Sequence, residues 1–159
     1  MNLAFIITLT VRYLLVILFL PFSALDKILN FRGAVAQAQE RVPTQSLARL
    51  LILVGLGVEI LMPLAILTGI ADRLAALIMA LYCLATALLW KQFWTPGDFW
   101  RAGASRGRDL FWDFLKNVSL AGGFLLITFG GNLGGAQAFI AHPLASSHPY
   151  ALPRHASTP

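Results

Sequence analysis

Four long apolar runs constrain the fold of this chain more than any other feature. They cover residues 3–25, 47–70, 74–94 and 110–131. A helix needs about 20 apolar residues to cross the hydrocarbon core of a bilayer. Strands of membrane barrels alternate apolar and polar residues over short segments, and these runs do not. The sequence therefore predicts an all-α integral membrane protein, a bundle of four transmembrane helices.

Composition agrees with this class. The 159 residues are 58% hydrophobic and 12% charged, whereas soluble domains carry about 25% charged residues. The length suits one transmembrane domain, over residues 1–135. Residues 136–159 are rich in Pro, Ser and His, and we expect them to form a disordered tail.

The first run could also be a secretory signal peptide. Such a peptide has a basic segment before its apolar core and small residues before its cleavage site. Here no Lys or Arg precedes Arg12, and Phe22 stands where a small residue is expected. We therefore expect a retained helix.

The basic residues predict the orientation. They gather in the connections after the first and third runs, as Lys27, Arg32, Arg41 and Arg49, and as Lys91, Arg101, Arg106 and Arg108. The positive-inside rule places both connections in the cytoplasm and both termini in the periplasm, across a bacterial inner membrane. The net charge of +5 then reflects attraction to anionic lipid headgroups, not to nucleic acid.

Tryptophans mark the connection between the third and fourth runs. Tryptophan favours the headgroup region because its ring is apolar and its N–H is polar. The favoured interpretation is an interfacial anchor, and the alternative is a docking surface for a cytoplasmic partner. The residues concerned are Trp90, Trp94, Trp100 and Trp112.

Several cofactors do not fit the residues present. No histidine lies in any apolar run, which argues against a bis-histidine haem, and the single Cys83 cannot hold an iron–sulfur cluster. The tail histidines His142, His148 and His155 are irregularly spaced, so no metal site is predicted. The sequence predicts no covalently bound cofactor. A redox role would involve a quinone or the cofactor of a partner protein.

A charged side chain lies inside each of the first two runs. Glu59 is near the centre of the second and Arg12 lies within the first. Intramembrane charges are paired or functional by default, so an Arg12–Glu59 ion pair is expected at one polar site, where Tyr13 could donate a hydrogen bond to a quinone carbonyl. Two other interpretations stay open: the pair only locks two helices together, or Arg12 extends to the interface.

Other residues complete the candidate site. Pro63 lacks an N–H and leaves the carbonyl of Glu59 without its helical partner, so a kink is expected there. Lys27 ends the first run on the same side as Lys116 and Asn117, which predicts a cytoplasmic vestibule. Alternatively, Lys116 only anchors its helix at the interface.

Three segments resemble the DoxX-like family of small membrane proteins. They are residues 11–29, with Arg12, Ser23 and Lys27; residues 57–76, with Glu59 and Arg73; and residues 116–123, with Asn117. The resemblance implies four transmembrane helices. Because the family is named for a subunit of a membrane quinone oxidoreductase, it also implies a quinone-linked role.

The leading hypothesis is an accessory subunit of a quinone-linked oxidoreductase, not catalytic alone, with a redox protein as partner. One alternative is a non-catalytic assembly or scaffold protein that works through its aromatic connection. The other is a proton-coupled small-solute carrier that uses Glu59. With four spans, a carrier would have to form a homo-oligomer.

Replacing Glu59 by Gln tests whether this carboxylate is functional. If it is, the variant folds and accumulates normally in membranes but its cellular activity is lost, since only the charge is removed. The measurements are the yield of membrane-inserted protein and the activity of the complemented strain. Normal activity with a reduced yield would instead identify a structural lock.

Overall fold

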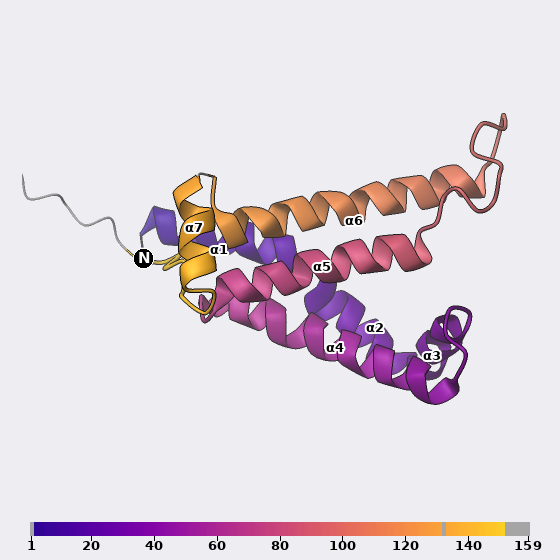
Figure 1. The fold of residues 1–159 in the computed structure, drawn as a ribbon, viewed down its shortest axis with the longest axis horizontal. Coiled ribbons are helices and arrows are strands. Elements are labelled where there is room, and N and C mark those ends of the chain that lie inside the picture. Colours follow the sequence, from indigo (N-terminus) through magenta and orange to yellow (C-terminus); the bar gives the residue numbers. More distant parts are fainter. Residues whose placement is uncertain (1, 132, 152–159) are drawn as a thin grey trace, which may run out of the picture.

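The computed structural model describes residues 2–131 and 133–151, and every regular element in this part of the chain is helical. Figure 1 shows the long helices lying roughly along one axis, with the short helix α7 standing across it at one end. In chain order they are α1 (Leu3–Val16), the π-helical η1 (Leu18–Ser23), α2 (Ala24–Leu29), α3 (Phe31–Gln39), α4 (Gln45–Thr68), α5 (Asp72–Trp90), α6 (Arg106–Phe129) and α7 (Leu133–Ala141).

Four helical segments in the described residues are long and apolar enough to cross a membrane. They are Leu3–Leu29, Gln45–Thr68, Asp72–Trp90 and Arg106–Phe129. The predicted all-α membrane bundle is therefore confirmed, with boundaries shifted by a few residues. The third segment ends at Trp90 and not at residue 94. The fourth starts early because Ser105 caps it, with its side chain accepting a hydrogen bond from the N–H of Arg108.

The first segment, expected as one helix over residues 3–25, is interrupted at Leu20. Leu20 has non-helical torsions, φ −118° and ψ 112°. Pro21 follows it, and a proline both lacks an N–H and disfavours helical geometry in the preceding residue. By contrast, α4 runs through Pro63 as one continuous helix. The marked departure from helical geometry therefore lies at Pro21, not at the predicted Pro63.

Helix α5 forms the centre of the bundle. Its buried face is built largely from small side chains, which let neighbouring helices approach closely. Larger core residues, Ile66 from α4 and Phe124 from α6, pack against it. The small buried residues of α5 are Ala75, Ala76, Ala80, Cys83 and Ala87.

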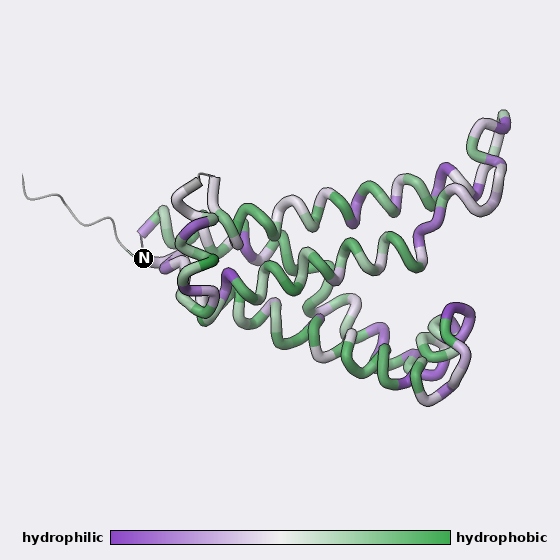
Figure 2. Tube along the Cα trace, viewed as in Figure 1, coloured by the Kyte–Doolittle hydropathy of each residue, from purple (hydrophilic) through white to green (hydrophobic). Residues whose placement is uncertain are grey.

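Apolar side chains also cover the outside of the bundle. Leu53, Leu81 and Leu126 are each more than half exposed, and the middle of the helices is hydrophobic in Figure 2 while polar residues gather toward the ends. An apolar exterior suits a protein whose solvent is lipid.

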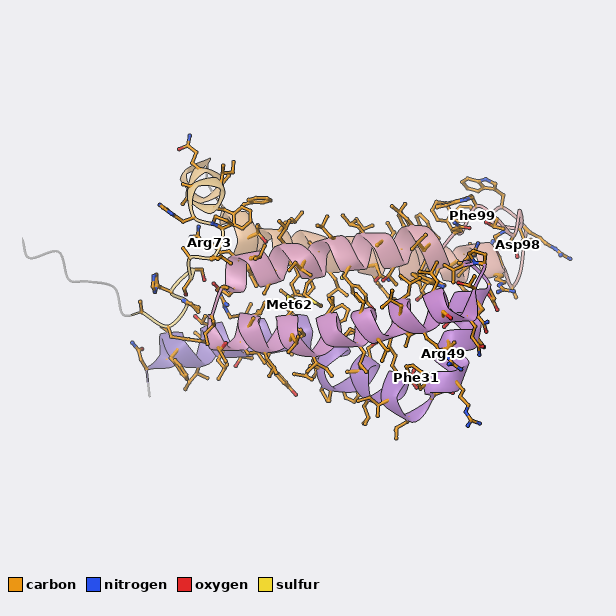
Figure 3. The ribbon with its side chains drawn as sticks, turned by 60° about the horizontal axis from the view of Figure 1, so that its bottom comes forward. Phe31, Arg49, Met62, Arg73, Asp98 and Phe99 are labelled. Carbon is orange, nitrogen blue, oxygen red and sulfur yellow. The ribbon has the colours of Figure 1, made fainter. Side chains whose placement is uncertain are left out.

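The bundle has two unlike ends. One end, named here the basic end, holds α3 and the connection 91–105, and Figure 3 places Phe31, Arg49, Asp98 and Phe99 there. The other, the terminal end, holds the start of α1, α7 and the C-terminal segment 142–151, and Arg73 lies on this side in Figure 3. At the basic end α3 packs on α4 through a small second core of Val35, Ala38 and Ala48.

The disordered tail predicted from residue 136 is wrong for residues 136–151. Helix α7 packs through Phe139 on Phe129, with ring centroids 5.6 Å apart. Beyond it, the ring of Tyr150 lies tilted against that of Phe5, with centroids 4.9 Å apart, and its hydroxyl donates to the carbonyl of Leu67. These aromatic contacts bury apolar surface and so stabilise one conformation of the segment. Residues 152–159, with His155, lie outside the described residues.

Gly69 makes room for this segment. It ends α4 in a left-handed conformation, φ 78°, which a residue with a side chain rarely adopts. A Cβ atom at Gly69 would also lie 3.0 Å from the ring of Pro149. The turn after α4 and the docking of the C-terminal segment therefore depend on the same residue.

The connection 91–105 is held in place by Asp98. Its carboxylate accepts hydrogen bonds from the backbone N–H groups of Arg106 and Gly107, at 2.9 and 2.8 Å, and so caps α6. Gly107 has no room for a side chain, because a Cβ atom would lie 2.8 Å from Asp98 Oδ1. Arg108 adds bonds from Nη1 to the carbonyls of Phe99 and Arg101.

The cap predicts a pH dependence for this connection. Hydrogen bonds from Gly107 and Arg106 lower the pKa of the Asp98 carboxyl below its usual value near 3.8. The cap is thus fully stabilising above pH 3.8 and is lost as the pH falls through the lower folded-state pKa. Amide hydrogen exchange of residues 91–105 should accelerate in that acid range after correction for intrinsic rates. In the Asp98→Asn variant, the amides of residues 91–105 should exchange faster at neutral pH and show no acceleration in the acid range. An acid acceleration equal to that of the unaltered protein would contradict the capping role of Asp98.

Candidate functional site

The buried charges form two separate clusters and not the single predicted site. Arg12 pairs with Asp72, their Nη1 and Oδ2 atoms 2.8 Å apart, while Glu59 pairs with Lys27, their Oε1 and Nζ atoms 2.8 Å apart. The expected Arg12–Glu59 pair is therefore wrong. Both residues are paired as intramembrane charges should be, but each has a partner that the sequence did not indicate.

The inner cluster surrounds the carboxylate of Glu59. Lys27 Nζ donates to both carboxylate oxygens, at 2.8 and 3.0 Å. The hydroxyls of Ser23 and Tyr82 donate to Oε1 at 2.9 and 2.8 Å. The Glu59 side chain is only 2% exposed and that of Lys27 is 20% exposed. The cluster thus joins the first span, α4 and α5.

Local helical spacing builds this cluster. Ser23 and Lys27 lie four residues apart and so share one face beyond the break at Leu20. On α4, Gly55 precedes Glu59 by the same spacing, and a Cβ atom at Gly55 would lie 3.3 Å from the Tyr82 hydroxyl. Gly55 therefore leaves the space that Tyr82 occupies. Lys27 points inward to Glu59 instead of outward to the interface.

Four hydrogen bonds offset the cost of burying the Glu59 carboxylate. An unpaired charge in such a place costs several kcal/mol, and pairing returns most of it only when the geometry is good and further donors are present. Lys27 supplies the opposite charge, and Ser23 and Tyr82 supply the further donors. The cluster is consequently a rigid polar centre inside an apolar bundle.

The inner cluster borders a cavity of about 610 Å³. Its walls come from η1, α2, α3, α4, α5 and α6, and most of them are apolar. The cavity brings together the three predicted vestibule residues, Lys27, Lys116 and Asn117. It also adds residues that the prediction did not include: Ser23, Gln37, Gly55, Glu59, Tyr82, Thr86, Trp90, Lys91 and Asp113.

A second set of polar residues lies toward the basic end of this cavity. Asp113 pairs with Lys91 at 3.1 Å and with Lys116 at 3.2 Å. Asn117 donates to the carbonyl of Asp113 at 2.9 Å. The side chains of Lys91, Lys116 and Asp113 are 31%, 72% and 41% exposed. These four residues, Lys91, Asp113, Lys116 and Asn117, are therefore far more accessible than Glu59. They are called the cavity mouth from here on.

An apolar groove adjoins the cavity. It measures about 670 Å³ and lies between the first span and α6, with Leu15 and Leu115 in its walls and Trp112 and Lys116 also lining it. Leu18, Lys116 and Leu120 line both spaces. The cavity is thus next to a surface that faces lipid.

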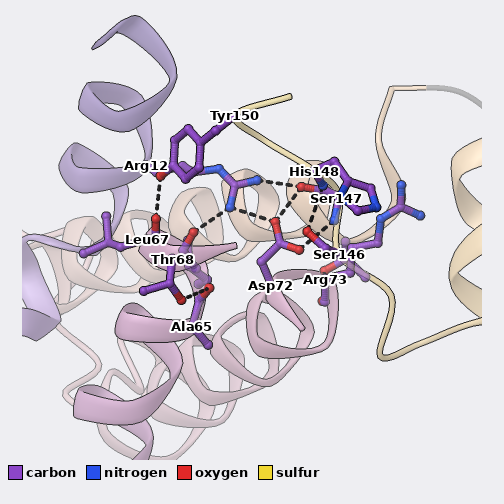
Figure 4. Close-up of polar contacts among 12 residues, drawn as sticks. Arg12, Ala65, Leu67, Thr68, Asp72, Arg73, Ser146, Ser147, His148 and Tyr150 are labelled. Carbon is purple, nitrogen blue, oxygen red and sulfur yellow. Dashed lines mark hydrogen bonds and ion pairs between the residues drawn. The ribbon is translucent and has the colours of Figure 1, made fainter. Parts of the chain in front are cut away.

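The outer cluster lies at the terminal end. Figure 4 shows Arg12 reaching Asp72, at the start of α5, and the C-terminal segment. Arg12 donates to the Ile66 carbonyl at 2.6 Å and to Ser147 Oγ at 2.8 Å. Ser147 in turn donates from its N–H and hydroxyl to the two oxygens of Asp72, at 2.8 and 2.5 Å. The side chains of Arg12 and Asp72 are 8% and 0% exposed.

The remaining predicted residues are spread over the surface. Tyr13 is 45% exposed and belongs to neither cluster. Trp94, Trp100 and Trp112 are 52%, 92% and 60% exposed, an arrangement that suits an interfacial anchor. Trp90 instead lines the cavity.

Sequence reasoning missed Tyr82, Asp72 and Ser147. Tyr82 is the single tyrosine of the third apolar run, so its polar hydroxyl was a usable signal. Asp72 stands at the edge of that run, where an acidic residue is usual at a helix start. Nothing in the local sequence of Ser147 indicates a contact with residues far away in the chain.

The fold and these clusters define a multi-pass α-helical membrane protein with a polar centre open to a cavity. The family model of DoxX matches residues 7–92. Because this is more than half of the chain, the protein belongs to the DoxX family. The match spans both ion pairs and Tyr82, whereas α6, with Lys116 and Asn117, lies beyond it. No curated protein and no solved structure matches the chain.

Replacing Asp72 tests the outer cluster. Asp72→Leu leaves Arg12 buried without an anion and should destabilise the protein by about 3–5 kcal/mol. Arg12→Leu should cost a similar amount, while the double variant should lose clearly less than the two single losses combined. Unfolding of the detergent-solubilised protein measures all three. Additive losses would show that the two charges do not interact.

Proposed function

We propose that this protein is an accessory subunit of a quinone-linked membrane oxidoreductase and that its cavity binds the quinone. The observation that carries the proposal is an apolar cavity with a hydrogen-bonded polar cluster, Lys27, Glu59 and Tyr82, along its wall. Ligand sites of this kind combine apolar walls with a few well-placed polar groups.

The size and surroundings of the cavity support a quinone. Its volume of about 610 Å³ falls within the range of roughly 300–1,000 Å³ usual for small-molecule sites. The adjoining groove, walled by Leu15, Leu18, Leu115 and Leu120, suits the long apolar chain of a membrane quinone. The cluster of Lys27, Glu59 and Tyr82 supplies the polar groups that the oxygen atoms of a quinone or quinol head would meet at the cavity wall.

Electrons would come from a partner protein. The transmembrane segments contain no histidine and the chain has one cysteine, so its own residues offer no haem or iron–sulfur ligation. The partner would dock at the connection 91–105, where Trp94 and Trp100 are exposed. In this arrangement the chain binds the quinone but is not catalytic alone.

The proposed location is the inner membrane of a bacterium, with both termini in the periplasm. The positive-inside rule supports it, because the connection with Arg41, between α3 and α4, and the connection with Lys91, between α5 and α6, both lie at the basic end. Exposed Arg101 and Arg106 near that end would attract anionic headgroups.

A proton-coupled carrier is the second candidate. It is favoured by the buried Lys27–Glu59 pair, since protonating Glu59 would release Lys27 inside the cavity. A carrier of this size would act as a homo-oligomer. Uptake by sealed vesicles that collapses with the proton gradient would support it.

Filling the cavity tests the quinone proposal. Gly55 lines the cavity, so Gly55→Leu should displace Tyr82, occupy the space and weaken binding of a short-chain ubiquinone at least tenfold. Gly57→Leu is the matched control, because a Cβ atom at Gly57 would meet nothing within 4 Å and Gly57 does not line the cavity. Titration of each variant in lipid nanodiscs measures the Kd.

Two further results bear on this proposal. Equal binding by the two leucine variants would place the quinone outside the cavity, and no binding by the unaltered protein would exclude the proposal. Capture of the tagged chain from native membranes should recover a redox protein together with quinone. Recovery with lipid alone would favour the carrier or a scaffold.

A further inference from the structure

The donors of the inner cluster are all occupied. An ammonium group has three N–H bonds and accepts none. Lys27 directs its three to Ser23 Oγ at 2.7 Å and to Glu59 Oε1 and Oε2 at 2.8 and 3.0 Å. The single hydroxyl protons of Ser23 and Tyr82 are both directed to Oε1 of Glu59.

The acceptors are not all occupied. Glu59 Oε1 accepts from Ser23, Lys27 and Tyr82, whereas Oε2 accepts only from Lys27 among the residues that the structure describes. Oε2 thus accepts one bond where Oε1 accepts three, so Oε2 is the carboxylate oxygen that can take a further donor. Glu59 lines the cavity.

We propose that the cavity selects a ligand that donates a hydrogen bond to Glu59 Oε2, so that it binds the quinol form in preference to the quinone. This inference rests on the proposed function and deepens it, because it assigns the redox form of the ligand. A quinol hydroxyl can donate to Oε2 without disturbing any existing bond of the cluster.

A quinone offers only acceptors to the same cluster. Its carbonyl oxygen would face the Oε2 lone pair, or would have to take a donor from Lys27 or Tyr82 that already serves Glu59. Leaving a buried polar group without a partner is unfavourable. The oxidised form therefore loses a hydrogen bond that the reduced form gains.

The cavity mouth does not make the same distinction. Lys116 is well exposed and bonds to Asp113 through one of its donors, so it can serve a carbonyl or a hydroxyl. Asn117 carries both a donor and an acceptor. Discrimination between the redox forms consequently arises at Glu59.

The test compares the two redox forms of one probe. Decylubiquinol and decylubiquinone are titrated anaerobically against the full chain in lipid nanodiscs, by calorimetry. The quinol should bind about tenfold more tightly, the factor expected for one added hydrogen bond to a charged acceptor. Gly57→Leu should retain this ratio, since Gly57 does not line the cavity and a Cβ atom there would meet nothing within 4 Å.

Two variants should reduce this preference by different routes. Glu59→Gln places an amide donor or a neutral acceptor in the cavity, so quinol affinity should fall and the preference should vanish. Ser23→Ala removes the acceptor of one Lys27 N–H, together with the Ser23 donor to Glu59 Oε1. The freed Lys27 donor can then serve a carbonyl, so quinone affinity should rise and the preference for quinol should shrink. Ser23→Ala keeps the ion pair, which keeps the test available if Glu59→Gln does not fold.

The outcomes separate the two proposals. If neither form binds, the proposed function fails. If both bind equally or the quinone binds more tightly, quinone-type binding stands and the selection at Glu59 is overturned. A preference that Ser23→Ala leaves unchanged would also overturn it, because Lys27 would then not limit quinone binding.

Discussion

The ion pair between Lys27 and Glu59 is the interaction on which the rest of the structure depends. A carboxylate that is 2% exposed in a bilayer-spanning helix requires an opposite charge. Lys27 supplies it from the first span, beyond the interruption at Leu20. Tyr82 completes the site from α5, so one electrostatic requirement fixes three spans against one another and forms the polar wall of the cavity.

The second ion pair fulfils a different role at the other end of the bundle. Arg12 and Asp72 are also buried, but their remaining polar atoms contact Ser147 and the Ile66 carbonyl. That cluster lines neither of the two cavities. The chain thus separates a polar centre bordering a cavity from one that holds helices and the C-terminal segment together.

The sequence predicted the fold well and the site only in part. Run length and composition determine the four spans. Lipid offers no hydrogen-bond partners, and an α-helix satisfies its backbone N–H and C=O groups within one segment. Charges such as Arg12 and Glu59 were correctly recognised as unusual, but their partners depend on helix rotation and on the break at Leu20, which hydropathy does not encode. The order of the C-terminal segment was missed because its few aromatic contacts carry more weight than its polar composition.

The contact between Arg12 and Ser147 has a consequence for biosynthesis. The two residues are 135 positions apart, so the first helix enters the membrane long before its last hydrogen-bonding partner has left the ribosome. Asp72 neutralises Arg12 when the third span follows. The outer cluster is complete only once the chain has been translated past Ser147, which makes the docking of its C-terminal segment a late step in the assembly of the bundle.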